Sequence, residues 1–232
     1  MNYRNLIYKL ILLDADGTLF DYDKAERFAL EQALTHYSYK GDLKKIRKRY
    51  RDINNTLWEE LEKGAIKKDQ LRTKRFFRLF NEYGLKYNVN KFSNYYLESL
   101  GEASFLIDGS ENMCKYLSQK YTLVILTNGI KEVQLSRLEK SSINQYISDI
   151  IVSEEAGVNK PNPDIFEYTL NRLNHSDKDS VIIIGDSLTS DIQGGINFGI
   201  DTCWLNLNNI DNETNIKPKY CVNSLDALTN IL

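Results

Sequence analysis

Two aspartates stand two positions apart near the start of the chain, directly after an apolar run. Asp14 and Asp16 follow the run 8–13 and precede Gly17. Near the end of a strand, side chains two positions apart can project toward the same side. An ionised carboxylate could then attack phosphorus, while its neighbour holds a proton for the leaving oxygen and later takes one from water. The alternative is an acidic turn that caps a helix, and the pair alone does not decide between the two.

A second pair of acids follows a later apolar run. Asp186 comes after the run 181–184, and Asp191 follows about one helical turn later. Together with Asp14 and a backbone carbonyl near Asp16, these carboxylates could hold Mg²⁺, which prefers oxygen ligands. Without a metal ion, Asp14 would repel a dianionic phosphate. We therefore predict Mg²⁺ as the cofactor, the alternative for this segment being a strand-to-helix turn with a capping residue.

Groups suited to an anion follow another apolar run and precede a proline. Thr127, Asn128 and Gly129 come after the run 121–126, and Lys160 precedes a proline. The Thr127 hydroxyl and the backbone N–H groups of Asn128 and Gly129 could bind phosphate near a helix start, where the helix dipole favours an anion. The Lys160 ammonium could bind the phosphate or the attacking carboxylate. Each residue alone is also typical of a helix cap or a surface lysine, so the prediction rests on their joint occurrence.

The rest of the chain indicates how these groups come together. Short apolar runs that end in polar residues or glycine predict buried strands, and segments with helical spacing lie between them. The predicted strands are 8–13, 121–126, 147–152, 181–184 and 202–205, and the predicted helices are about 111–119, 131–140, 163–173 and 189–198. This alternation predicts an α/β fold with a parallel sheet. Ligands of such sheets bind beyond the carboxyl ends of the strands, where the polar groups described above lie.

One long segment interrupts the alternation. Residues 21–106 contain no convincing strand and instead show amphipathic, charge-rich helical stretches with several aromatic residues. We predict a helical subdomain inserted after the first strand, so that 1–20 and 107–232 form the core and 21–106 forms a cap. The basic run 44–51 within the insertion is interpreted as a solvated helix face, the alternative being a positive field that attracts an anionic substrate.

Composition excludes several other classes of protein. The chain of 232 residues is 42% hydrophobic with a formal net charge of -2, and it lacks the basic excess typical of proteins that bind nucleic-acid polymers. Its three cysteines lack paired metal-site spacing, which favours reduced thiols in a cytoplasmic protein. No stretch approaches the ~18 apolar residues of a membrane helix, and the first apolar run is too short for a signal peptide. We expect a monomer or homodimer that binds neither a membrane nor a nucleic-acid polymer.

Four segments in chain order resemble the motifs of phosphatases of the haloacid dehalogenase (HAD) superfamily. They are Asp14–Phe20, with the sequence Asp-Ala-Asp-Gly-Thr-Leu-Phe, then Thr127–Gly129, Lys160–Pro161 and Gly185–Asp191. The resemblance implies a role for each motif: Asp14 as nucleophile, Asp16 as acid and base, Thr127 and Lys160 as phosphate binders, Asp186 as metal ligand and Asp191 as its support. It also implies a Rossmann-like core and, from the position of the insertion, a helical cap of the first type (C1).

Asp16 separates two branches of this superfamily. Dehalogenases lack an acid at this position because their leaving group needs no proton, so Asp16 favours phosphate chemistry. A closer resemblance, to the pyrimidine 5'-nucleotidases of the superfamily, spans nearly the whole chain and implies hydrolysis of nucleoside 5'-monophosphates. It is carried by 153–162, 194–206, 54–58, 64–66 and 75–76. Gly17 departs from that group, but glycine is common there in the superfamily.

Contacts to a nucleotide base would come from the insertion. A base needs a stacking surface and hydrogen-bond partners, which makes Asn54, Trp58 and Arg75 candidates. The alternative is that Trp58 and Phe76 form the core of the insertion. Because the cap selects the substrate, a sugar-phosphate or phosphoglycolate phosphatase and a phosphomutase remain alternatives. Two non-enzyme alternatives are a receiver domain, which needs no long helical insertion, and an inactive binding protein, which would not need every motif residue.

Overall fold

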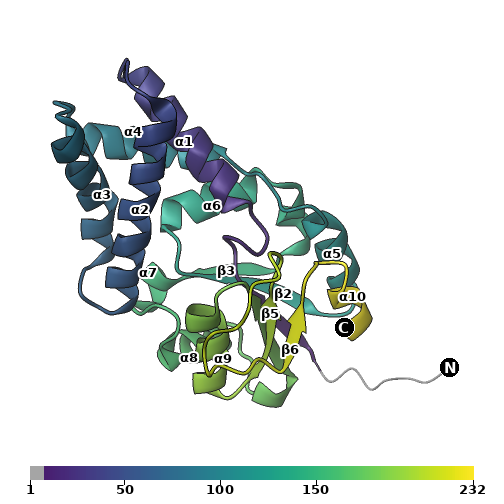
Figure 1. The fold of residues 1–232 in the computed structure, drawn as a ribbon. Helices are drawn as coiled ribbons and strands as arrows, with labels where there is room; N and C mark the ends of the chain where they lie inside the picture. The colour runs from purple at the N-terminus through teal and green to yellow at the C-terminus, as the bar shows by residue number, and fades with distance from the viewer. Residues whose placement is uncertain (1–7) are drawn as a thin grey trace. The chain divides into compact units, whose positions relative to one another are not determined.

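The chain folds into two compact units, which the computed structural model describes over residues 8–232 (Figure 1). The first unit contains the chain up to Tyr22 together with Ser104–Leu232, and the second contains Asp23–Ala103. The predicted insertion, 21–106, thus begins two residues before the second unit and ends three residues after it. In the described part of the chain, no helix is both long enough and apolar enough to cross a bilayer.

A parallel sheet of six strands forms the centre of the first unit. The strands are β1 (Leu10–Leu13), β2 (Thr122–Thr127), β3 (Asp149–Val152), β4 (Val181–Gly185), β5 (Asp201–Leu205) and β6 (Tyr220–Val222). Their order across the sheet is β3-β2-β1-β4-β5-β6, and every neighbouring pair is parallel. The predicted parallel α/β fold is therefore confirmed. The strand β1 lies between β2 and β4, so the three predicted motif strands are direct neighbours.

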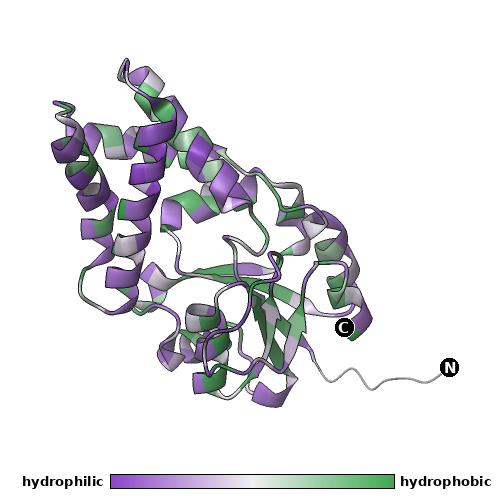
Figure 2. Cartoon of the chain, in the orientation of Figure 1, coloured by the Kyte–Doolittle hydropathy of each residue, from purple (hydrophilic) through white to green (hydrophobic). Residues whose placement is uncertain are grey.

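Both faces of this sheet are covered by apolar side chains. Successive side chains of a strand point to opposite faces. Ile11 and Leu13 accordingly belong to one hydrophobic cluster, whereas Leu10 and Leu12 belong to another. Burial on two faces explains why the strands are continuous apolar runs rather than alternating patterns, and Figure 2 shows the central strands as mainly hydrophobic. The buried strand β1 thus fixes the backbone from which Asp14 projects.

Helices connect the strands of the first unit, as the sequence predicts for parallel neighbours. They are α5 (Ser110–Leu117), α6 (Lys131–Glu139), α7 (Ser153–Ala156), α8 (Pro163–Arg172), α9 (Gln193–Phe198) and α10 (Leu228–Ile231), with 3₁₀ turns η1 (Ser142–Tyr146) and η2 (Lys178–Ser180). The predicted helix 189–198 is instead a π-helical turn, η3 (Leu188–Ile192), followed by α9. The sequence did not predict β6, α7 or α10, because segments of three or four residues are too short to show a periodic pattern.

The second unit is helical, and no strand occurs among residues 23–103. Its helices are α1, which begins at Tyr22 (Tyr22–His36), α2 (Leu43–Glu62), α3 (Lys68–Tyr83) and α4 (Val89–Glu102). Aromatic side chains fill its interior. The ring of Phe76 lies 5.5 Å from that of Tyr50, 4.9 Å from that of Phe92 and 5.1 Å from that of Tyr96, between ring centroids. Phe76 therefore belongs to the core of this unit, as the alternative in the sequence analysis expects.

Candidate active site

Asp14 lies at the carboxyl end of β1 in a nearly closed environment. Its backbone N–H donates to the carbonyl of Ile184 at 2.9 Å, which holds it against the end of β4. The residue is 8% exposed. The ammonium of Lys160 donates to its Oδ1 atom at 2.5 Å. The sheet thus presents one partly accessible carboxylate that already carries a cationic partner.

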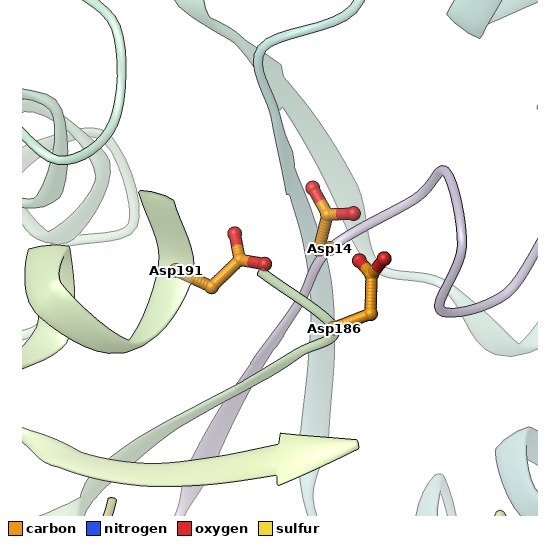
Figure 3. A group of neighbouring side chains, drawn as sticks. All are labelled: Asp14, Asp186 and Asp191. Carbon is orange, nitrogen blue, oxygen red and sulfur yellow. The ribbon is translucent and has the colours of Figure 1, made fainter. Parts of the chain in front are cut away.

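Three carboxylates converge beyond the ends of β1 and β4 (Figure 3). Asp14, Asp186 and Asp191 each offer an oxygen atom, and these atoms lie within 4.8 Å of one another. Asp186 follows β4 directly, and the π-helical turn η3 carries Asp191 back toward it. The backbone N–H of Ser187 donates to Asp191 Oδ2 at 3.1 Å. A Cβ atom at Gly185 would lie 2.2 Å from the same oxygen, so this position requires glycine.

Lys160 is a buried cation at the centre of this group. Its residue is 1% exposed, and its Nζ atom lies 2.5 Å from Asp14 Oδ1, 2.7 Å from Asp191 Oδ1 and 2.5 Å from the carbonyl of Leu126. The side chain of Asn128 fixes the backbone of Lys160. Asn128 Oδ1 accepts from the Lys160 N–H at 2.9 Å, and Asn128 Nδ2 donates to the Lys160 carbonyl at 2.9 Å. Asn128 therefore positions the lysine, a contribution that the sequence analysis did not anticipate.

The electrostatics of the group reflect an excess of acids. Burial raises the pKa of Asp14 well above its ordinary value; Lys160 opposes this shift, and Asp191 and Asp186 reinforce it. Desolvation and then Asp191 raise the pKa of Asp186 from 3.8 to about 7. Burial would lower the pKa of Lys160, but its contacts with Asp14 and Asp191 raise it instead. The ammonium stays charged, and the crowded carboxylates carry more negative charge than it balances.

This excess fits a divalent cation. Three ionised carboxylates and one ammonium leave a formal charge of -2, which a Mg²⁺ ion would neutralise. The donor set consists of hard oxygen atoms, as Mg²⁺ prefers. Among the described residues, the group contains Asp14, Asp186 and Asp191 but not the side chain of Asp16. That a backbone carbonyl near Asp16 completes the site stays a prediction.

Thr127 ends β2 beside β1 and is 1% exposed. Its hydroxyl oxygen accepts a hydrogen bond from the Gly129 N–H at 2.9 Å. Because the oxygen accepts this bond, the hydroxyl can still donate its own hydrogen bond, and its role as a phosphate binder stays a prediction. The Gly129 N–H, which the sequence analysis also assigns to phosphate, is engaged by this bond. The structure thus favours the Thr127 hydroxyl over the Gly129 N–H as the donor to an anion.

Asp16 is held by two side chains that the sequence analysis missed. Gln134 Nε2 donates to its Oδ2 atom at 2.5 Å, and Arg137 Nη1 forms a short contact with its Oδ1 atom. Gln134 and Arg137 both lie on α6, the helix that follows the Thr-Asn-Gly motif. Their spacing of three residues places them on one face of that helix. Their burial and their contact with Asp16, which lies more than 100 positions away, come from the packing of the helix and leave no signal in the sequence.

The turn after Asp16 contacts Asp186. The Thr18 hydroxyl donates to Asp186 Oδ1 at 3.3 Å, and the Trp204 indole donates to the Asp186 carbonyl at 2.8 Å. Gly17 has a φ of +83°, and a Cβ atom there would lie 2.4 Å from Asp186 Oδ2. Glycine is therefore required by both the backbone conformation and the close approach of the carboxylate.

The three candidate base contacts lie in the second unit, and two of them are internal to it. Asn54 and Arg75 are 0% and 1% exposed, and Arg75 Nη1 donates to Asn54 Oδ1 at 3.3 Å. Asn54 Nδ2 in turn donates to Glu26 Oε2 at 3.4 Å. These contacts favour a structural role for Asn54 and Arg75 over the predicted contact with a base. Trp58 is partly exposed and remains a candidate.

Comparison with known proteins places this geometry in a family. A sequence profile of the haloacid dehalogenase-like hydrolases matches residues 11–205. The chain is 34% identical to the pyrimidine 5'-nucleotidase PynA of Streptococcus pneumoniae, over 98% of this chain and 96% of PynA. It is 32% identical to the pyrimidine 5'-nucleotidase YjjG of Escherichia coli, over 96% of each chain.

A solved structure resembles the chain over nearly its full length. The crystal structure of the HAD-hydrolase YfnB of Bacillus subtilis, described as bound to magnesium, superposes with a TM-score of 0.90. The match has 35% sequence identity and covers 97% of this chain and 98% of YfnB. The profile covers both the first and the last predicted motif, and the relatives match across both units. The residues at the strand ends and these nearly full-length matches support the same assignment. The chain belongs to the haloacid dehalogenase-like hydrolases.

Proposed function

We propose that the chain is a Mg²⁺-dependent phosphomonoesterase that forms an aspartyl-phosphate on Asp14 and acts on pyrimidine nucleoside 5'-monophosphates. The observation that carries the chemistry is the buried Lys160 ammonium, bound between Asp14 and Asp191 at the strand ends. Burial raises the pKa of Asp14, and Lys160 opposes this shift and so favours the ionised form that a nucleophile requires.

The proposed reaction has two displacement steps at phosphorus. The Asp14 carboxylate forms a bond to phosphorus as the bond to the leaving oxygen breaks, and Asp16 gives its proton to that oxygen. Because Lys160 engages the Oδ1 atom of Asp14, we assign the attack to Oδ2. Water then attacks the phosphorus, and Asp16 takes a proton from it. Inorganic phosphate leaves, and the Asp14 carboxylate is restored.

The remaining residues of the site have supporting roles in this proposal. The Thr127 hydroxyl donates a hydrogen bond to a phosphate oxygen, while its own oxygen accepts a hydrogen bond from the Gly129 N–H. Asp14, Asp186 and Asp191, with the backbone carbonyl of Asp16, would hold Mg²⁺. When bound, the ion offsets the negative charge of the phosphate and the carboxylates.

The choice of a pyrimidine nucleotide rests on the relatives. PynA and YjjG are both named pyrimidine 5'-nucleotidases, and each matches this chain across the helical second unit as well as the first. We assign the second unit the role of a substrate-selecting cap, with the partly exposed Trp58 as the candidate surface for stacking a base.

A substrate panel tests the proposal directly. Phosphate release would be measured with dUMP, UMP, dTMP, AMP, a sugar phosphate and phosphoglycolate, in Mg²⁺ and in EDTA. We expect the highest kcat/KM for a pyrimidine nucleotide in Mg²⁺ and no turnover in EDTA. Efficient turnover of the sugar phosphate without turnover of any nucleotide would reject the nucleotidase assignment and retain the phosphatase. Full activity in EDTA would reject the metal assignment.

A further inference from the structure

The side chain of Asp16 is fixed by a buried pair on α6. Gln134 and Arg137 are 1% and 0% exposed, and they contact different oxygen atoms of the Asp16 carboxylate. The Asp16 side chain itself keeps 26% of its surface exposed. A carboxylate held at both oxygens has its plane fixed, whereas an exposed aspartate would rotate freely. The pair therefore determines the direction in which the remaining lone pairs of Asp16 point.

Arg137 also supports the turn that carries Asp16. Its guanidinium lies 4.5 Å from the centroid of the Phe20 ring, and Phe20 is fully buried. The backbones of Asp16 and Phe20 form a β-bridge, and the Gly17 N–H donates to the Phe20 carbonyl at 2.9 Å. One arginine thus contacts both the carboxylate of Asp16 and the ring of Phe20, whose backbones pair across the same turn. All these residues belong to the first unit.

Gly129 leaves the space that Gln134 occupies. A Cβ atom at position 129 would lie 2.1 Å from Gln134 Nε2, the atom that donates to Asp16. The φ of Gly129 is not in the left-handed region, so backbone conformation alone does not require glycine there. Because Gly129 has no side chain, the amide of Gln134 can reach the Asp16 carboxylate.

We propose that Arg137 and Gln134 are positioning residues that aim the Asp16 carboxylate at the leaving oxygen of the substrate. Arginine stays protonated in proteins, and a glutamine amide is not an acid, so neither residue replaces Asp16 as proton donor. Their effect is on geometry, where a displacement of about 1 Å costs on the order of 10² in rate. This inference rests on the proposed phosphatase activity and deepens it.

The test compares two leaving groups that differ in their need for a proton. The alcohol of dUMP leaves well only when protonated, whereas p-nitrophenolate leaves as a stable anion. The ratio kcat/KM reports the steps up to release of this group, before the aspartyl-phosphate is hydrolysed. For Arg137→Met, we expect kcat/KM for dUMP to fall about 10²-fold and that for p-nitrophenyl phosphate to fall less than about 5-fold.

Four further variants make the test decisive. Gln134→Met removes only one donor, so we expect the same selective loss at about 10-fold, and it serves if Arg137→Met does not fold. Adding Arg137→Met to Asp16→Asn should cost little beyond Asp16→Asn alone, because both act through one group. Arg172→Met is the matched control. Arg172 binds Asp149 and Glu155 on the surface of the same unit, and its variant should match the wild type on both substrates.

The outcomes separate this inference from the proposed function. A selective loss on dUMP in either variant, with KM nearly unchanged, supports a positioning role. An equal loss on both substrates, or full additivity with Asp16→Asn, overturns it and indicates general structural support. If the wild type hydrolyses p-nitrophenyl phosphate but not dUMP, any alkyl phosphate that it does hydrolyse replaces dUMP. A wild type without activity on any phosphate ester refutes the proposed function and this inference with it.

Discussion

Each unit contains a cluster of charged side chains, and the clusters differ in how their charge is balanced. In the first unit, the ammonium of Lys160 contacts Asp14 and Asp191, and the exposed Asp186 lies beside these two carboxylates. They lie beyond the ends of parallel strands, where β1 and β4 stop. The result is a surplus of negative charge at the edge of a sheet, a place where α/β proteins bind ligands.

The cluster of the second unit lies between helices and has no such surplus. Glu26, 1% exposed, lies 3.7 Å from Arg51 Nε and accepts from Asn54 at 3.4 Å. Arg75 donates to Asn54, and its guanidinium lies 4.8 Å from the centroid of the Tyr96 ring. One carboxylate therefore faces two guanidinium groups and an aromatic ring. This cluster is balanced by protein groups and needs no cation.

The comparison shows that a perturbed pKa does not by itself identify a catalytic group. Desolvation is the main cause that raises the pKa of Asp186 to about 7, and it raises the pKa of Glu26 to about 7 as well. The two carboxylates are alike in this respect. What distinguishes them is the net charge of the surrounding group and its place in the fold, so functional assignment from a raised pKa needs both.

The largest predicted difference between the clusters is in catalysis. Asp14→Asn removes the proposed nucleophile, and we expect kcat to fall at least about 10⁴-fold, the range seen when a nucleophile is removed. Glu26→Gln, a matched change in the other cluster, should leave kcat within about twofold because Glu26 touches no reacting group. Steady-state kinetics with dUMP would measure both, and circular dichroism would confirm folding. Similar losses in the two variants would contradict the distinction drawn here.

Metal binding should separate the clusters next. Mg²⁺ at about 100 times its Kd should raise the free energy of unfolding by about 3 kcal/mol, because it binds the folded site alone. Urea denaturation with Mg²⁺ and with EDTA would measure this difference. It should disappear in Asp186→Asn, which loses a proposed ligand, and persist in Glu26→Gln. Stabilisation by Mg²⁺ that survives Asp186→Asn would place the ion elsewhere.

The sequence predicted the first cluster well because its members follow apolar strands. Asp14 and Asp186 each follow an apolar strand directly, and Lys160 precedes a proline, so these positions could be located without the fold. Arg137 was missed because its partner Asp16 lies 121 positions away, and only the packing of α6 brings the two together. Contacts of this kind depend on tertiary structure and leave no local pattern.

The second cluster shows the limit of the same reasoning. Its helices were predicted from amphipathic stretches, but the faces that polar residues occupy were not. The residue types of Asn54 and Arg75 suit contacts with a nucleotide base, yet both side chains are buried and bonded to each other. The short strand β6, which contains the exposed Cys221, was also missed. The type of a residue shows which contacts it can make, whereas the packing of the helices determines which residue it contacts.

Proton binding offers a third comparison, in the absence of metal. The pKa of Asp14 is raised in the folded chain, and that of Asp186 is raised from 3.8 to about 7. At pH values between the ordinary and the raised pKa, the folded state binds more protons than the unfolded state. The free energy of unfolding should therefore fall as pH rises from about 4 to about 7. Asp186 is exposed and water screens its charge, so in EDTA we expect a loss on the order of 1 kcal/mol by urea denaturation, less than the full pKa shift would give. Mg²⁺ binds the ionised carboxylates and should reduce this loss, and an unchanged pH profile in Mg²⁺ would argue against the site.

Glu26 should contribute a smaller loss of the same sign that Mg²⁺ does not relieve. Its pKa is raised from 4.5 to about 7, mainly by desolvation against the opposing effect of Arg51, so its ionisation destabilises the folded unit as pH rises through that range. Glu26→Gln replaces the carboxyl with a group that cannot ionise. We expect this variant to gain about 1 kcal/mol over the wild type at pH 8 and little at pH 5, with or without Mg²⁺. Urea denaturation at the two pH values would measure the gain. A variant less stable than the wild type at pH 8 would contradict this prediction. It would show that the ion pair between Glu26 and Arg51 stabilises the folded unit by more than the desolvation of Glu26 destabilises it.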